Sequence, residues 1–237
     1  DIAISETKLD SSVNSSSFVR LGGYYYSVSG SGGATGDIFV HLMFGDRGNG
    51  GLEAFWEAQE MLSDDTRTWK VLGSGTIVDP GNLQYNTYYP FTISYDGDNT
   101  FRFTANGQTD TYLGPPRIRD AVTEWAGIST GINVQNSSDD GYISAKIDNV
   151  VINDQPSVYD DFSAEQLDLT KWQSVCWVRE VQPGILRANL QAVDSTSQVN
   201  TSLTEPYKRT SYLQAKVRID SDSQLSPGAI GIARLQG

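Results

Sequence analysis

Acidic side chains are the first place to look for chemistry in this sequence. Glu53, Glu57 and Glu60 lie close together in the stretch from Leu52 to Leu62. Two carboxyl groups about 5–5.5 Å apart form the nucleophile and the acid/base of a retaining glycoside hydrolase. On a strand, spacings of four and three do not keep all three glutamates on one face. We interpret them as solvated strand residues, and we expect a protein that is not an enzyme.

The other reactive residue types do not form a catalytic or metal-binding set. His41 is the only histidine and Cys176 the only cysteine, so neither an internal disulfide nor a His–Cys zinc site is expected. Both lie in alternating apolar runs, which predicts a half-buried His41 and a buried Cys176. The glycine-rich segment 30–36 lacks the lysine of a phosphate-binding loop, and we interpret it as a loop.

Aromatic side chains provide a second kind of chemistry, because exposed rings beside polar groups bind sugars by stacking. We expect Trp172 and Trp177 to lie in the core, since alternating strands bury every second residue. The candidate carbohydrate-binding residues are Tyr24, Tyr26, Trp56 and Trp125.

Composition excludes some partners. The chain has 237 residues and a net charge of −12, without a basic stripe that could displace the counterions of a nucleic acid. The same charge disfavours docking on anionic lipid, and we expect no insertion into a membrane. The acidity is consistent with solubility, or with binding of divalent cations.

The elements that must position these residues are short strands separated by Gly, Asn and Asp. Asn106-Gly107 predicts a tight hairpin turn, and the ambiguous stretch 52–62 is interpreted as a strand rather than a helix. In the stretch 142–152 alternation places Ile143, Ala145, Ile147 and Val151 on one face. Further strands are predicted at 38–44, 71–78, 91–95, 101–105 and 212–219.

The two ends of the chain repeat each other. Ala233 to Gly237 matches Val19 to Gly23, and Val217 to Asp222 resembles Ile2 to Thr7, with one residue of slippage between the two blocks. Such a duplication indicates that the chain spans about one period of a tandem array.

A turn-forming segment at 154–157 divides the sequence into a longer piece, 1–153, and a shorter one, 158–237. The shorter piece opens with Asp160-Asp161-Phe162-Ser163 and continues with Leu167-Asp168-Leu169-Thr170-Lys171-Trp172. This start resembles the concanavalin A-like jelly roll of laminin G-like modules and laminarinase-type glucanases. The phrase Ile147-Asp148-Asn149-Val150 resembles the closing strand of the same superfamily.

The resemblance implies an all-β, antiparallel two-sheet jelly-roll sandwich whose beginning follows its end. Residues 1–153 would be the C-terminal two-thirds of a unit, and residues 158–237 the first third of the next unit or of the same, permuted one. The chain is then a slice of a tandem array, a self-closing permutant, or a subunit that exchanges strands with its copies. The duplication favours the first and the third, since a self-closing permutant holds one strand pair too many.

The resemblance also implies a calcium site where the first and last strands meet, with Asp148, Asp160 and Asp161 as ligands. The Glu-x-Asp-x-x-Glu strand of the glucanases is absent. We therefore expect a non-enzymatic, extracellular or cell-surface module that assembles with copies of itself or with adjacent repeats. The alternative is a calcium-dependent, lectin-like module that binds polysaccharide, and a glucanase is the weaker third possibility. Asn14, Asn136 and Asn200 begin glycosylation sequons.

Overall fold

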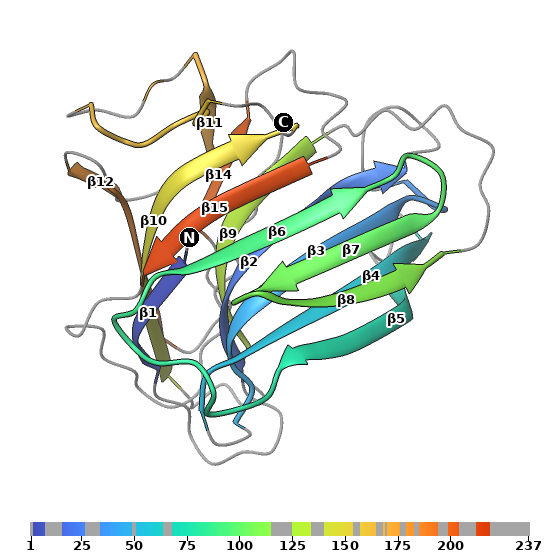
Figure 1. Ribbon diagram of the computed structural model, residues 1–237, viewed down its shortest axis with the longest axis horizontal. Coiled ribbons are helices and arrows are strands. Elements are labelled where there is room, and N and C mark those ends of the chain that lie inside the picture. The colour runs from blue at the N-terminus through green and yellow to red at the C-terminus, as the bar shows by residue number, and fades with distance from the viewer. Residues whose placement is uncertain are drawn as a thin grey trace.

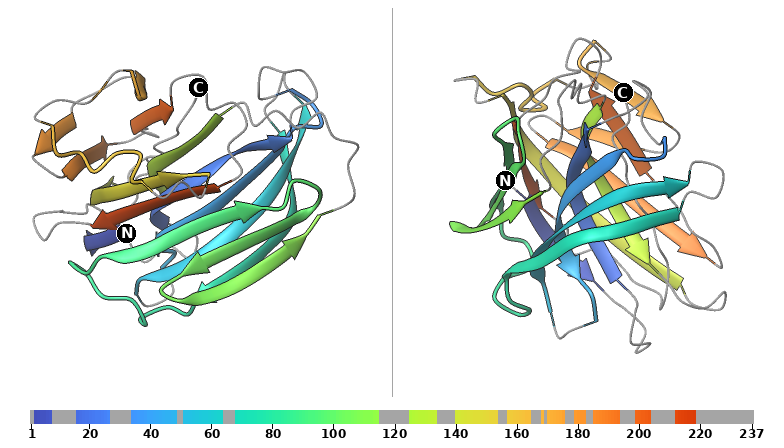
Figure 2. Two further views of the ribbon diagram at one scale, coloured as in Figure 1. Left: turned by 45° about the horizontal axis from the view of Figure 1, so that its top comes forward. Right: turned by 90° about the vertical axis from the view of Figure 1, so that its right-hand side faces the viewer.

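The structure is a computed structural model of the chain, and it consists of strands without helices in the part that it describes. Two sheets pack face to face as a sandwich (Figures 1 and 2). The predicted all-β, two-sheet sandwich of jelly-roll type is confirmed. The described residues are 2–7, 16–26, 34–48, 51–63, 68–114, 125–133, 140–153, 157–164, 168, 170–175, 179–182, 185–193, 199–203 and 212–218.

The eight-stranded sheet combines strands from both pieces of the sequence, and nearly all of its neighbours run antiparallel. The exception is a single parallel pair, Ala3 with Arg218. The order across the sheet is β12 (Arg179–Gln182), β13 (Ile185–Val193), β10 (Asp140–Ile152), β1 (Ile2–Thr7), β15 (Tyr212–Arg218), β6 (Tyr89–Tyr95), β7 (Thr100–Ala105) and β8 (Gln108–Leu113).

The seven-stranded sheet is antiparallel throughout and also takes strands from both pieces. Its order is β11 (Trp172–Val175), β14 (Val199–Leu203), β9 (Trp125–Asn133), β2 (Ser16–Tyr26), β3 (Ile38–Asp46), β4 (Glu53–Ser63) and β5 (Thr68–Val78).

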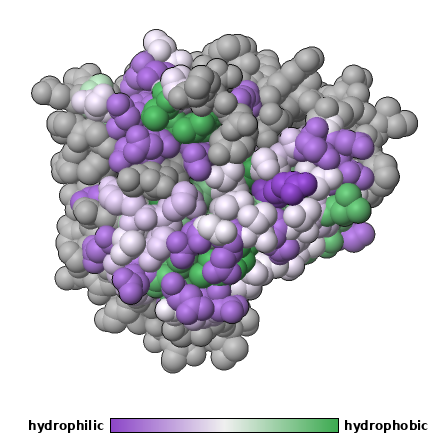
Figure 3. All heavy atoms as spheres, in the orientation of Figure 1, coloured by the Kyte–Doolittle hydropathy of each residue, from purple (hydrophilic) through white to green (hydrophobic). Residues whose placement is uncertain are grey.

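Aromatic rings from the two sheets form much of the core between them. Phe44 of β3 stacks on Phe91 of β6 with ring centroids 4.9 Å apart, and Tyr25 of β2 meets Phe101 of β7 edge-on. These pairs bury large apolar areas and add geometry-dependent ring contacts. On the face seen in Figure 1, the described residues at the surface are mainly hydrophilic or neutral, with separate hydrophobic areas (Figure 3).

Local sequence signals explain several elements. Asn106 and Gly107 have φ values of 48° and 76°, so the predicted tight turn between β7 and β8 is confirmed. The ambiguous stretch 52–62 forms strand β4, because its alternate residues Ala54, Trp56 and Ala58 are needed in the core.

Strand β10 departs from the predicted alternation at its C-terminal end. Ile143, Ala145 and Ile147 are buried as expected, but the next buried residues are Val150 and Ile152 rather than Val151. The pairing register with β15 shifts between Asp148 and Val151, and Asn149 has a φ of 51°. This irregularity reverses the faces of the residues after it, which a strict period of two cannot predict.

In this single chain both pieces of the sequence build one sandwich. The strands of the second piece, β11 to β15, are distributed over both sheets beside strands of the first piece. A self-closing chain was expected to hold one strand pair too many. In the eight-stranded sheet β1 and β15 instead lie in the same position beside β10, where each of them pairs with a part of that strand.

Candidate functional site

The position between β10 and β6 is filled by two strands from opposite ends of the sequence, and we call it the shared position. Ile2 of β1 and Val217 of β15 both pair with Ile147 of β10. One step along β10, Ala3 and Arg218 both pair with Lys146. β6 borders both strands on the other side. In Figure 1 the arrowhead of β15 ends beside the beginning of β1.

The residues of β1 in the shared position are fully buried. Ile2, Ala3 and Ile4 are 0% exposed, and Ile4 faces Ala145, which is also fully buried. β15 covers the C-terminal half of β10 and β1 covers the middle of it. The long strand β10 therefore obtains its neighbour on this side from both ends of the chain.

A polar cluster of Arg20, His41, Glu57 and Ser129 lies on the seven-stranded sheet, on the face away from the other sheet. Each of the first three alternates along its strand with core residues, which places it on the outer face. His41 lies directly opposite Glu57 on the neighbouring strand, and Arg20 lies opposite Ser129. Arg20 is 8% exposed and His41 3%, so these two side chains are nearly shielded from solvent.

The hydrogen bonds of the cluster fix the state of the imidazole. Arg20 donates from Nε to Oγ of Ser129 and from Nη1 to Nδ1 of His41, both at 3.2 Å. A guanidinium only donates, so Nδ1 accepts and the proton of neutral His41 resides on Nε2. That Nε2 lies 3.4 Å from Oε1 of Glu57 but makes no hydrogen bond of normal geometry. The cluster thus holds a buried donor that is aimed at a carboxylate and left unsatisfied.

Electrostatics keep His41 neutral and Glu57 ionised. Burial, with a smaller effect of the Arg20 charge, lowers the pKa of His41 to about 4, although Glu57 acts in the opposite direction. Burial alone would raise the pKa of Glu57, but His41, the amide of Gln59 and the charge of Arg20 outweigh it and lower that pKa. At neutral pH the cluster therefore presents a neutral N–H donor beside an anionic acceptor.

This donor and acceptor suit hydroxyl groups better than ions. The Glu57 side chain is 26% exposed, so part of the cluster reaches solvent. Half-buried Trp69 packs on Phe39, which lies against His41, and so brings an aromatic ring near the same place. The prediction of a half-buried His41 is wrong, because the residue is only 3% exposed, and Arg20 was not among the predicted site residues. The signal was present, since Arg20 stands between core residues in an otherwise apolar run.

The neighbouring Glu53 has a structural role. It is fully buried, and both of its carboxylate oxygens accept hydrogen bonds from Arg47, at 2.7 and 2.6 Å. The guanidinium of Arg47 also lies over the ring of Phe55, 4.0 Å from its centroid. The prediction of solvated glutamates is therefore wrong for Glu53, whose charge is neutralised by a bidentate ion pair.

Trp56 does not present the exposed ring that was predicted. It is 5% exposed, stacks on Phe103 at 4.7 Å and 4°, and donates from Nε1 to Oδ2 of Asp110 at 2.6 Å. Alternation along β4 places Trp56 on the same face as Ala54 and Ala58, which points between the two sheets. A sugar cannot stack on the ring there.

For the other predicted aromatic residues the structure gives the position of the backbone within the sheet. Tyr24 of β2 pairs with Trp125 of β9, so these two residues meet across neighbouring strands of the seven-stranded sheet. Tyr26 lies on the same strand and pairs with Ile38 of β3. The surroundings of these three side chains lie outside the described part, and their role in carbohydrate binding stays a prediction.

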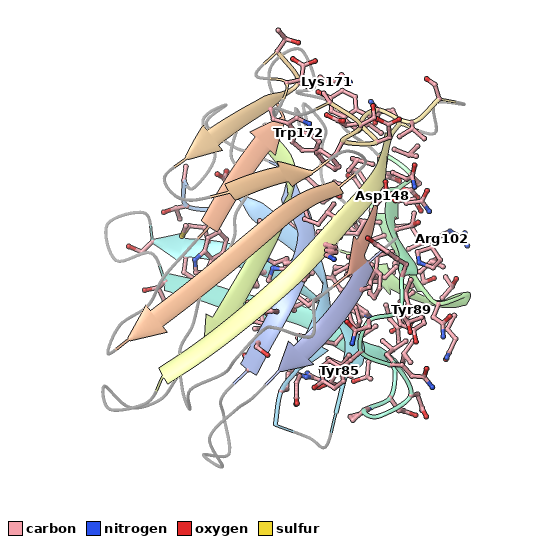
Figure 4. All side chains as sticks on the ribbon, turned by 90° about the vertical axis from the view of Figure 1, so that its left-hand side faces the viewer. Tyr85, Tyr89, Arg102, Asp148, Lys171 and Trp172 are labelled. Atoms are coloured by element: carbon pink, nitrogen blue, oxygen red, sulfur yellow. The ribbon has the colours of Figure 1, made fainter. Side chains whose placement is uncertain are left out.

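The predicted calcium ligands come from segments that meet. A bridge between Val150 and Asp160 brings the start of the second piece to the end of β10, where Asp148 lies. Figure 4 shows Asp148 along β10, with Trp172 and Lys171 toward its C-terminal end. The carboxylate of buried Asp160 accepts from the backbone N of Phe162 at 2.8 Å and from Nε1 of Trp172 at 2.6 Å.

These bonds give Asp160 a structural task, and a cation there would have to share its oxygens. Asp161 is exposed, and hydrogen bonds from Ser163 lower the pKa of its carboxyl. Within the described residues no three His, Cys, Asp or Glu side chains lie close enough together to hold a metal ion. A calcium site at Asp148, Asp160 and Asp161 stays a prediction.

Comparison with known protein families, curated proteins and solved structures gave no match to this chain. None of the described segments is a helix long and apolar enough to cross a membrane. The geometry of the shared position and of the polar cluster therefore carries the functional argument.

Proposed function

We propose that this chain is a non-enzymatic structural or adhesion module of the extracellular space that assembles through strand exchange or tandem repetition. The observation that carries this proposal is the shared position, where Ile2 and Val217 pair with the same residue, Ile147. Because the ends of the sequence resemble each other, either end provides a strand for this position.

The physical basis of the proposal is that no single continuous strand completes the sheet beside β10. β1 and β15 are far apart in the sequence, yet each completes a part of the same strand row beside β10. A row that accepts separate segments of one chain accepts equivalent segments from an adjacent repeat or another copy, since the backbone hydrogen bonds are the same.

Light scattering across a dilution series tests this proposal. Self-association predicts masses that increase with concentration in multiples of the 25.9 kDa chain, and electron microscopy of concentrated samples should show filaments or defined particles. A monomer at every accessible concentration would contradict assembly between separate copies. Incubation with laminarin and lichenan should release no reducing ends, and release of sugar would contradict the non-enzymatic part.

The polar cluster supports a second candidate, a lectin-like module that binds polysaccharide. The unsatisfied N–H of His41 and the partly exposed carboxylate of Glu57 match the donor and acceptor needs of a sugar hydroxyl. In this candidate calcium at Asp148, Asp160 and Asp161 would fix the end of β10.

Glycan arrays with the wild type, Glu57→Gln and the matched control Glu60→Gln separate this candidate from the first. Binding by the wild type and Glu60→Gln, lost in Glu57→Gln, is the expected pattern for a site at the cluster. A chelator arm tests the calcium requirement. Silence across diverse glycans, or equal loss in both variants, would remove the candidate.

A further inference from the structure

Strand β8 forms one border of the eight-stranded sheet in the described part of the chain (Figure 1). Four of its six residues are exposed, and Leu113 is 68% exposed. Its pairing with β7 is regular, without a bulge. A regular strand at the border of a sheet is a template for a further strand, because the N–H and C=O groups on its outer side point away from the sheet.

The two-residue turn between β7 and β8 fixes which backbone groups point to the outer side. The pair that flanks such a turn, which includes Gln108, exchanges hydrogen bonds, and bonded and non-bonded pairs then alternate along the hairpin. Thr109, Thr111 and Leu113 therefore direct their N–H and C=O groups away from β7. The hydroxyls of Thr104 and Thr109 lie 2.9 Å apart, which agrees with a non-bonded pair, whose side chains approach more closely.

Asp110 binds the central outer N–H group of β8. Its Oδ1 accepts from the backbone N–H of Thr111 at 2.7 Å, and its Oδ2 accepts from Nε1 of Trp56 at 2.6 Å. A Cβ at Gly75 of β5 would lie 2.6 Å from the same Oδ2, so this glycine leaves room for the carboxylate. Asp110 therefore ties β8 to the other sheet and competes with an added strand for the N–H of Thr111.

We propose that a second copy of this chain adds its own β8 to this border, antiparallel and centred on Thr111. The paired residues are then Thr111 with Thr111, Thr109 with Leu113, and Asp110 with Tyr112. The contact uses the same surface on both copies, so it joins two eight-stranded sheets about a twofold axis and closes at a dimer. This inference rests on the assembly proposed above and adds a contact surface separate from the shared position.

The backbone directions and the charge of β8 favour a copy of itself as the added strand. The register centred on Thr111 places outward-directed N–H and C=O groups opposite each other, and it keeps the same face of both strands toward the core. A register centred on Asp110 meets the same conditions, but it places two carboxylates directly opposite each other, which is destabilising. With Thr111 at the centre each Asp110 faces Tyr112 instead, and the exposed Leu113 gains a neighbour across the contact.

Asp110 weakens this pairing, because each copy must first break the bond between this carboxylate and Thr111. Asp110→Ala removes the competing acceptor, and the dissociation constant measured by analytical ultracentrifugation should fall about tenfold or more. Trp56→Phe is the matched control, since it removes the other hydrogen bond of Asp110 but leaves the carboxylate beside Thr111. It should associate like the wild type. Equal tightening in both variants, or none in Asp110→Ala, would overturn the proposal.

A second substitution tests the position of the contact. Added to Asp110→Ala, Thr111→Pro removes the central N–H group, and proline is tolerated on an edge strand where that N–H points away from the neighbouring strand. Association should then fall below that of the wild type. Thr111→Val keeps the N–H and should leave the association of Asp110→Ala tight. Tight association in the proline variant would overturn the proposal.

Disulfide trapping tests the register without a change at Asp110. In a full-length Cys176→Ser background, Thr111→Cys would face its own copy with about 5.5 Å between the Cα atoms, which suits a disulfide. Thr109→Cys is the control, because Thr109 is also exposed but faces Leu113 of the other copy.

Mild oxidation should give severalfold more product of twice the chain mass from Thr111→Cys than from Thr109→Cys. Equal yields would indicate random collision and overturn the inference, as would the absence of any product. Assembly seen by light scattering to the same extent in every variant, without this cross-link, would spare the proposed function while removing the β8 contact.

Discussion

Acidification should destabilise this protein through His41. The pKa of His41 is lowered by burial from 6.5 to about 4, while the unfolded chain keeps the ordinary value. A folded-state pKa below the unfolded one gives stability that is complete above pH 6.5 and is lost as the pH falls toward 4. Geometry gives the same sign, because protonation of Nδ1 removes the acceptor for Arg20 and places two cations side by side.

The size of the effect follows from the two pKa values. The difference between 6.5 and about 4 corresponds to about 3 kcal/mol of unfolding free energy, of which about 2 kcal/mol is lost by pH 5. Other groups also titrate in this range, so the wild type must be compared with a variant that lacks only this one. His41→Asn is suitable, because its amide oxygen can still accept from Arg20 and its side chain does not titrate.

Urea unfolding of both proteins between pH 7.5 and pH 4.5 measures the difference. We expect the free energy of unfolding of the wild type to fall relative to that of His41→Asn as the pH decreases. Because His41 is the only histidine, its NMR titration gives the folded-state pKa without ambiguity. A folded-state pKa near 6.5, or a difference between the two proteins that does not change with pH, would refute the reasoning.

Three further substitutions test the packing. Gly22→Ala should cost about 1–3 kcal/mol in thermal or urea unfolding, because a Cβ there lies 2.8 Å from both a backbone oxygen and the Cβ of His41 on β3; unchanged stability would contradict the close approach. Trp56→Phe keeps an aromatic ring in the core but removes the donor to Asp110, and we expect the free energy of unfolding to fall by about 1–3 kcal/mol. Asp110→Ala removes the acceptor of the same hydrogen bond and serves as the partner variant. Asp160→Asn should lower the free energy of unfolding by a similar amount, about 1–3 kcal/mol. The two oxygens of Asp160 accept from the indole of Trp172 and from the backbone N–H of Phe162, whereas an amide offers only one acceptor oxygen. The same loss with and without calcium would favour a structural role for this residue.

Alternation and turn chemistry were sufficient to predict most of the fold. The Asn106-Gly107 turn and the choice of strand for 52–62 follow from positive φ and from a period of two. The irregularity at Asn149 was missed, because it depends on where the register of β15 shifts along β10. That shift is set by pairing between segments far apart in the sequence, which a local pattern does not contain.

The candidate site was predictable only in part. Alternation could place Glu57 and His41 on outward faces, but not directly opposite each other, because cross-strand register depends on the intervening loop. Trp56 was wrongly predicted to be an exposed carbohydrate-binding residue. Its partner Phe103, on the other sheet, is what places it in the core.

The two repeated ends of the sequence differ at a position where the sandwich tolerates only glycine. Arg20 has its counterpart in Arg234, so the copy keeps the residue that holds His41. Gly22, however, corresponds to Gln236, and β3 approaches Gly22 too closely for any Cβ. A side chain at the position of Gly22, such as that of glutamine, would therefore displace His41 on the neighbouring strand β3.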